Sequence, residues 1–136
     1  MVAESFKFEL VSPERLLLSE DVDQVVVPGS EGDFTMLANH APVLAVLRPG
    51  LLDVVMQGGE EVRYYVRGGF AEAGPAGLTV LAQQAVNVAD LDRSRLAQDV
   101  KDAHKDVSDA SDEEARHMAL ETLARLESIQ AILQQG

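Results

Sequence analysis

Residues 88–107 read VADLDRSRLAQDVKDAHKDV, and this stretch decides the fold because the hydrophobic period of the chain changes within it. Asp90 or Asp92 is placed to cap the start of a helix. Beyond them, apolar side chains recur at spacings of four, three and four residues, at Leu96, Val100, Ala103 and Val107. Such spacing places these side chains on one face of an amphipathic helix.

A second helix is expected after a short polar connection. The run from Ser108 to Ser111 favours a break, because short polar side chains bond to their own backbone. Ser111 and Glu114 have the spacing of a capping box, so we expect the second helix to begin near Asp112. Its apolar stripe is expected at Ala115, Ala119, Thr122 or Leu123, Leu126, Ile129 and Leu133. Two helices joined by so short a link pack antiparallel.

Upstream of Val88 the pattern is typical of short β-strands. All five prolines lie there, as do all the glycines except Gly136. Gly58-Gly59 predicts a hairpin. Strand-like runs lie at Phe6–Val11, Val25–Val27, Val43–Leu47, Leu51–Met56, Val62–Val66 and Leu78–Ala82. The predicted fold is an antiparallel β-sandwich, residues 1–87, followed by an antiparallel two-helix hairpin, residues 88–136.

The composition of the chain disfavours several classes of function. The 136 residues carry a net charge of −12, which opposes direct binding to nucleic acid or anionic lipid and favours a protein partner with basic patches. The absence of cysteine excludes thiol chemistry and suits a reducing compartment. The apolar runs are far shorter than the roughly 20 residues of a membrane span, so we expect no direct membrane insertion.

No catalytic constellation stands out. None of His40, His104 and His117 has a second histidine at the spacing of a helical zinc site, and no Gly-x-Ser-x-Gly elbow occurs. The glycine-bearing segment 28–33 lacks the Gly-Lys-Ser/Thr end of a phosphate-binding loop. We therefore expect a protein that is not an enzyme and that has no metal site and no cofactor.

Four short pieces then form a longer pattern. They are VPGSEGDF at 27–34, HAPVL at 40–44, LRPG at 47–50 and GGF at 68–70. In this order, and followed by Leu91-Asp92 and a helical hairpin, they resemble the epsilon subunit of F-type ATP synthases over essentially the whole chain.

The resemblance implies a non-catalytic subunit of the central stalk, or rotor, of a proton-driven synthase. Such a subunit couples proton transport through the membrane ring to ATP synthesis, and in some relatives it restrains ATP hydrolysis. The implied partners are the gamma stalk subunit, the loops of the c-ring and, through an extended hairpin, the alpha and beta head subunits. The implied location is peripheral, at the cytoplasmic face of the bacterial inner membrane.

The resemblance also implies roles for single residues. Ser12 and His40 correspond to the sandwich face that meets the gamma subunit, and Glu31 and Asp33 to an acidic tip that meets the polar loops of the ring. Each has a simpler interpretation as well. Asp33 suits a turn, and His40 precedes Ala41-Pro42, whose proline enforces an extended backbone.

Some relatives bind ATP through an Asp-x-x-Arg-Ala motif at the start of the first helix, which makes a nucleotide-responsive regulator the alternative function. Here Asp92 and Arg95 keep the motif, whereas Leu96 replaces its alanine. Asp99 and Asp102 follow where basic residues would help to hold a triphosphate, and acids there cost affinity. We expect a helix cap with a solvated arginine at this position instead.

Overall fold

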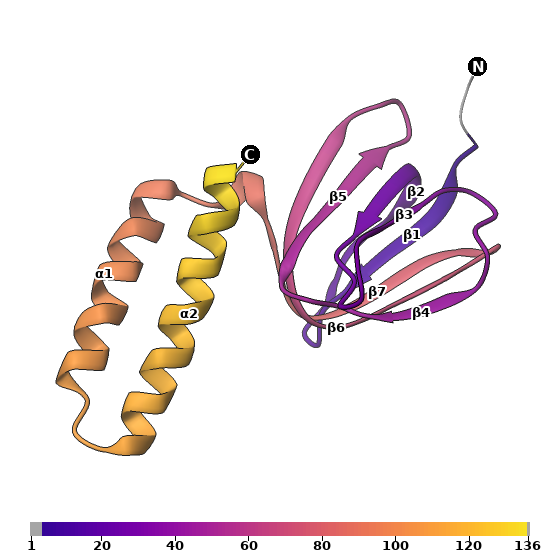
Figure 1. Cartoon of the computed structure of the whole chain (residues 1–136). Helices are drawn as coiled ribbons and strands as arrows, with labels where there is room; N and C mark the ends of the chain where they lie inside the picture. Colours follow the sequence, from indigo (N-terminus) through magenta and orange to yellow (C-terminus); the bar gives the residue numbers. More distant parts are fainter. Residues whose placement is uncertain (1–3, 136) are drawn as a thin grey trace. The chain divides into compact units, whose positions relative to one another are not determined.

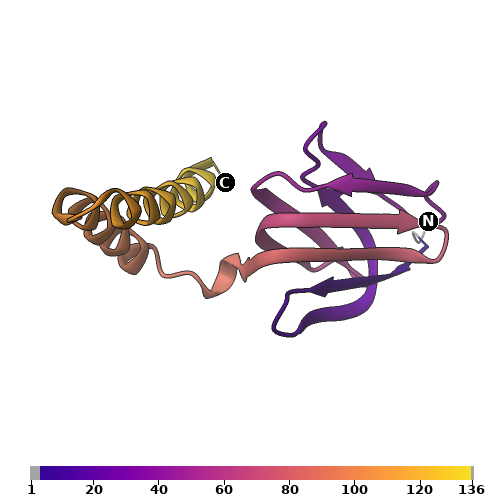
Figure 2. The ribbon, with the colours of Figure 1, turned by 90° about the horizontal axis from the view of Figure 1, so that it is seen from below.

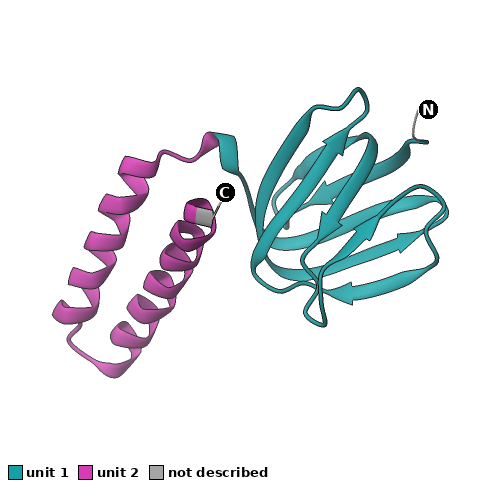
Figure 3. Ribbon diagram, turned by 45° about the horizontal axis from the view of Figure 1, so that its top comes forward, with its two compact units in different colours: residues 1–89 teal, residues 90–136 magenta. Residues whose placement is uncertain are grey.

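The chain divides into two compact units (Figure 3). A computed structural model describes residues 4–135. Residues 1–89 form the first unit, here the β-unit, and residues 90–136 form the second, here the helical unit. The short 3-10 helix η1, Val88–Asp90, spans the boundary. The predicted class, a β-sandwich followed by two helices, is confirmed.

The β-unit consists of seven strands that wrap around one core (Figures 1 and 2). They are β1 Phe6–Val11, β2 Leu16–Val27, β3 Phe34–Met36, β4 Val43–Val46, β5 Gly50–Met56, β6 Glu61–Gly74 and β7 Gly77–Asn87. The order is β1-β7-β6-β5-β2-β3, with β4 paired to β6 and with a further pairing between β1 and β2. This last pairing closes the sheet upon itself.

Long strands join the two layers. The first part of β6 pairs with β5 and its last part with β4, while β7 pairs with β6 along its length and with β1 over Gly77–Leu81. Between the two pairings of β6 lie Gly68 and Gly69, with φ angles of 71° and 99°. These left-handed values favour glycine and let one strand pass from one layer to the other.

Alternation along the strands builds the core, because successive side chains of a strand point to opposite faces. Its fully buried members are mainly β-branched and aliphatic, as the low aromatic content requires: Phe8, Leu10, Val22, Val25, Val27, Met36, Leu52, Val54, Val66, Ala71 and Val80. Burial of each large side chain stabilises the fold by about 1.5–3 kcal/mol.

The strands differ from the prediction in extent. The predicted run Val25–Val27 is only the end of β2, and β3 was not predicted at all. Strands β6 and β7 extend well beyond Val66 and Ala82. By contrast, the hairpin predicted at Gly58-Gly59 is present between β5 and β6, with both φ angles positive.

The helical unit is an antiparallel pair of helices, α1 Arg93–Asp109 and α2 Glu113–Gln135 (Figure 1). Its central contact joins Val100 and Ala103 of α1 to Leu123 of α2. The predicted stripe of α1 is confirmed, because Leu96, Val100 and Ala103 are buried. The predicted cap of α2 is wrong: the side chain of Asp112, not Ser111, accepts the hydrogen bond from the Ala115 N–H at 2.8 Å.

Candidate functional site

An unbroken apolar row crosses the outer face of the β-unit. Strand pairing places Val46 of β4 beside Phe70 of β6, and Phe70 beside Leu81 of β7. Leu81 lies beside Val11 of β1, which pairs with Leu16 of β2. We call these five residues the outer stripe. Cross-strand partners share one face of a sheet, so the outer stripe is continuous over five strands.

The outer stripe is open to solvent. The exposed fraction is 63% for Val46, 40% for Phe70, 38% for Leu81 and 53% for Leu16, while Val11 is half-buried. Contiguous exposed apolar side chains of this kind occur at interaction sites.

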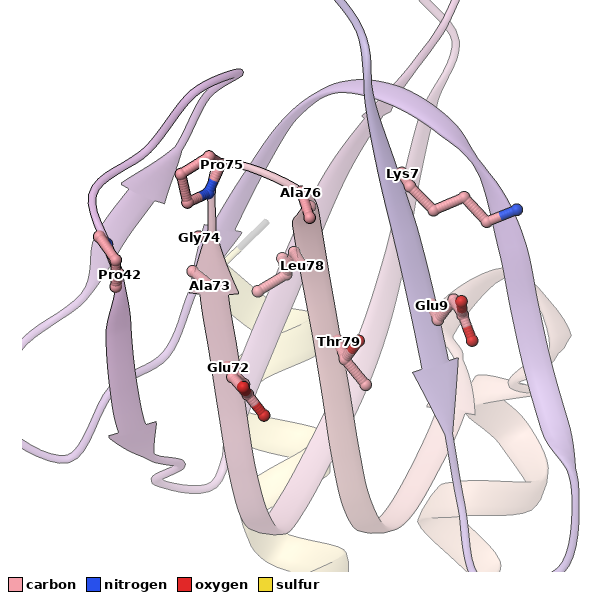
Figure 4. Close-up of a pocket in the computed structure, with 11 residues that line it drawn as sticks. Lys7, Glu9, Pro42, Glu72, Ala73, Gly74, Pro75, Ala76, Leu78 and Thr79 are labelled. Atoms are coloured by element: carbon pink, nitrogen blue, oxygen red, sulfur yellow. The ribbon is translucent and has the colours of Figure 1, made fainter.

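A polar row runs beside the outer stripe on the same face. Glu72 of β6, Thr79 of β7 and Glu9 of β1 are cross-strand neighbours, and Figure 4 shows them side by side. They line a shallow hollow together with Lys7 and the β6–β7 turn. The face therefore has an apolar row with an acidic border, the composition of an interface centre and its rim.

The predicted acidic tip lies in the connection between β2 and β3, residues 28–33, here called the tip loop. Both predicted carboxylates, Glu31 and Asp33, lie in it and are exposed. They differ in their partners: Asp33 forms an ion pair of 2.6 Å with Arg48, from the β4–β5 connection. The tip loop adjoins the β4 end of the outer stripe, because the Ser30 N–H donates to the Val46 carbonyl at 2.8 Å.

Ser12 and His40, the other two predicted contact residues, lie apart. The Ser12 hydroxyl donates to the Arg15 carbonyl at 3.2 Å within the β1–β2 turn, next to the Val11 end of the outer stripe. The His40 ring packs near Phe34, with a centroid distance of 6.1 Å, just beyond the tip loop. The structure thus does not join them in one cluster; each lies close to one of the two features described above.

Asp92 and Arg95, the candidate nucleotide ligands, begin α1. The Asp92 carboxylate accepts hydrogen bonds from the Ser94 and Arg95 N–H groups at 2.9 and 3.2 Å, which is N-cap geometry. The neighbouring Arg93 donates to the Leu133 carbonyl in the last turn of α2. The geometry is thus that of a helix cap, as expected for the simpler interpretation.

Within residues 4–135, no three His, Cys, Asp or Glu side chains converge as metal ligands. No helix among those residues has the length and apolar character needed to cross a membrane. What the β-unit does present is an apolar face with an acidic border, together with an acidic loop. These features define a class of protein that works by docking to other proteins.

Comparison with known proteins specifies the family. A family model described as "ATP synthase, Delta/Epsilon chain, beta-sandwich domain" matches residues 5–88. The ATP synthase epsilon chain of Maricaulis maris is 51% identical, over 96% of this chain and 98% of that protein. The epsilon chain of Mesorhizobium japonicum is 49% identical, over 97% and 98%. The chain belongs to the delta/epsilon chain family of ATP synthase, and the resemblance noted in its sequence is confirmed.

Two solved structures contain chains with a similar fold. A chain of the Euglena gracilis mitochondrial ATP synthase, in a structure of OSCP, F1 and c-ring, superposes with a TM-score of 0.76 at 25% identity. The match covers 98% of this chain and 84% of that one. A chain of the Tetrahymena thermophila central stalk and c-ring has the same fold, with a TM-score of 0.58 at 14% identity, over 96% and 99%. The family is one of structural subunits of the synthase rather than catalytic ones.

Sequence reasoning missed the outer stripe. Part of its signal was present: the run Val43–Leu47 is apolar at every position, and Thr79 alone interrupts the run Leu78–Ala82, where a strand with one solvated face alternates. Both runs were predicted as strands and were too short for membrane spans, but the exposure of their outer side chains was not predicted. An unbroken apolar strand in a two-layer fold indicates a second apolar face, and in β4 that face is exposed at Leu44 and Val46.

Proposed function

We propose that this chain is a central-stalk subunit of a proton-driven ATP synthase. It couples proton transport through the membrane ring to ATP synthesis without catalysing a reaction, and it sits peripherally at the cytoplasmic face of the inner membrane. Membership of the epsilon chain family supports this proposal. So does the likeness to a chain solved together with F1 and a c-ring.

The single observation that carries the proposal is the outer stripe, which we assign to the gamma stalk subunit. Torque is transmitted only through a contact that does not slip, and an apolar row on a rigid sheet provides one by excluding water. Ser12, beside the Val11 end, joins this contact. His40, beside the tip loop, contributes at the other end of the same surface.

The tip loop is assigned to the polar loops of the c-ring. Its exposed carboxylates complement basic or amide side chains on such loops, and charge complementarity fixes the register of a contact more than it adds affinity. The two features adjoin at Val46, so the β-unit meets stalk and ring with neighbouring surfaces.

The contact with gamma is tested in the full-length protein by Phe70→Asp and, separately, Leu81→Asp. Each places an unpaired charge where burial is required, so we expect the affinity for gamma, measured by calorimetry or interferometry, to fall at least about 100-fold. Leu37→Asp is the matched control, because Leu37 is 51% exposed and lies outside the outer stripe. Equal affinities for all three variants and the parent would remove the assignment.

A regulatory role is a second candidate function for the helical unit. It is favoured by two apolar side chains of α2 that face solvent, Met118 at 62% and Leu120 at 43% exposed. Residues two apart lie on opposite sides of a helix, so we assign Met118 and Leu120 to two separate contacts of α2 with the alpha and beta head subunits, which together restrain hydrolysis. Removal of residues 90–136 is expected to raise ATP hydrolysis by the assembled synthase, and Met118→Glu with Leu120→Glu to raise it similarly. Unchanged hydrolysis in both would leave coupling as the whole function.

A further inference from the structure

The tip loop is braced from within by its backbone. The Gly32 N–H donates to the Gly29 carbonyl at 3.1 Å, which closes a tight turn. Two further bonds tie the loop to its neighbours: Ser30 N–H to Val46 at 2.8 Å, and Arg48 N–H to the Pro28 carbonyl at 3.0 Å. Since these partners lie on either side of Leu47, the first half of the loop, from Pro28 to Ser30, is attached by its backbone to residues 46–48.

A side-chain clasp adds to this brace. Arg48 Nη2 donates to both carboxylate oxygens of Asp33, at 2.6 and 2.8 Å, and Nε donates to Oδ1 at 3.1 Å. Nη1 donates to the Pro49 carbonyl at 3.3 Å. A guanidinium that grips a carboxylate through several parallel bonds has a defined orientation, unlike a lysine point charge. The clasp therefore holds the last residue of the tip loop in place.

Gly50 leaves the space that the clasp needs. A Cβ at this position would lie 3.0 Å from Arg48 Nη1 and 3.1 Å from the Pro28 Cβ. The arginine side chain thus folds back across its own connection, over Gly50 and toward Asp33. Residues 48–50 are arranged as a support for the tip loop rather than as a plain turn.

The two acids of the tip loop are consequently not equivalent. The charge of Asp33 is compensated by Arg48 within the β-unit. Glu31 is exposed, and its carboxylate has no hydrogen bond or ion pair to any of residues 4–135. A contact that needs an uncompensated negative charge would find it at Glu31.

We propose that Arg48 is a positioning residue: it clasps Asp33, fixes the conformation of the tip loop and leaves Glu31 as the carboxylate offered to a basic or amide-bearing loop of the ring. This inference rests on the proposed ring contact and gives Asp33 and Glu31 different roles in it. Asp33 acts inside the molecule, and Glu31 acts across the interface.

The clasp is tested first in the free full-length protein, without the ring. Arg48→Gln removes the charge and the bidentate grip, so we expect amide hydrogen exchange at Ser30 and Gly32 to rise about tenfold or more. Arg63→Gln is the matched control, because Arg63 forms a similarly exposed pair with Asp53, at 3.3 Å with exposed fractions of 46% and 45%. Loop exchange that is unchanged in Arg48→Gln overturns the clasp.

The division of labour is tested in reconstituted synthase, by association with the ring and by proton-driven ATP synthesis. Glu31→Gln is expected to weaken both at least fivefold and to leave loop exchange unaltered. Arg48→Gln is expected to weaken ring association and to loosen the loop as well. The exchanged pair Asp33→Arg with Arg48→Asp is expected to restore a slow-exchanging loop and most of the ring association.

Failure of the inference and failure of the proposed function give different results. If Asp33→Asn weakens ring association with a slow-exchanging loop while Glu31→Gln has no effect, Asp33 makes the contact itself and the inference is overturned, although the ring contact stands. If no variant changes ring association, the ring contact is wrong, which also overturns the role of Glu31.

Discussion

The stability of the whole β-unit depends on the absence of a side chain at Gly69. Its φ is 99°, and a Cβ there would lie only 1.8 Å from the Leu81 carbonyl oxygen, so an alanine meets both backbone strain and a clash. We expect Gly69→Ala to lower the free energy of unfolding by about 4 kcal/mol or more. Urea denaturation followed by circular dichroism measures this loss.

Gly58 provides the comparison for that substitution. Its φ is 101°, close to that of Gly69, but a Cβ there would meet nothing within 4 Å. Gly58→Ala therefore carries the conformational cost alone, about 1–2 kcal/mol. If Gly69→Ala and Gly58→Ala lowered the free energy of unfolding equally, the close approach of Gly69 to β7 would contribute nothing to the cost of the substitution.

The positions of the candidate site residues were only partly predictable from the sequence. The acids of the tip loop follow from a local motif, and the structure places both on that loop. That Asp33 is held by Arg48 depends on two connections meeting in space, which no local pattern encodes. The outer stripe depends in the same way on strand register, because Phe70 and Leu81 become neighbours only through pairing.

Among the elements, α1 offers the clearest single test. Asp92, not Asp90, accepts the capping hydrogen bonds, so Asp92→Ala leaves two N–H groups of the first turn unsatisfied. We expect a loss of about 1 kcal/mol in the stability of the helical unit. Faster amide exchange at Ser94 and Arg95 would report it, and Asp90→Ala, three residues from the first helical position, serves as the control.

Helices and strands were predicted correctly where the hydrophobic spacing of the segment itself reveals them. They were predicted incorrectly where pairing with a distant strand determines the structure. The helical stripe of α1 follows from spacing alone and is confirmed at Val100 and Ala103. The first half of β2 includes the exposed acids Glu20 and Asp21, so its sequence lacks the alternation typical of a strand. It is a strand because it pairs with β1. Gly68 and Gly69 are breakers by composition, yet β6 runs through them because both layers pair with it.

At the scale of the whole molecule, the two units differ in the size of their cores. The β-unit buries a large cluster that draws on every one of its strands except β4, whereas the contact between α1 and α2 is centred on Val100, Ala103 and Leu123. A small core offsets less conformational entropy. We expect hydrogen exchange to show two tiers, with amides of α1 and α2 opening at a lower free energy than those of β6 and β7.

Native-state exchange at increasing denaturant measures both tiers in one experiment. As denaturant increases, the amides of α1 and α2 should come to exchange with one common opening free energy, while the amides of the β-unit stay protected. Leu123→Ala should lower the helical tier by about 2–5 kcal/mol and leave the upper tier unchanged. A single common opening free energy for all slow amides would contradict the division into two independently stabilised units.

The parallel pairing of β1 with β7 has a consequence for how the protein is made. The ribosome releases β1 first, yet its partner is complete only about 70 residues later, at Leu81. At about 5–20 residues per second, Lys7 to Val11 wait roughly 4–14 s before that edge is covered. The nascent β-unit therefore closes only after most of the chain has been translated, and its first strand, with the apolar Phe8 and Leu10, is without its parallel neighbour until then.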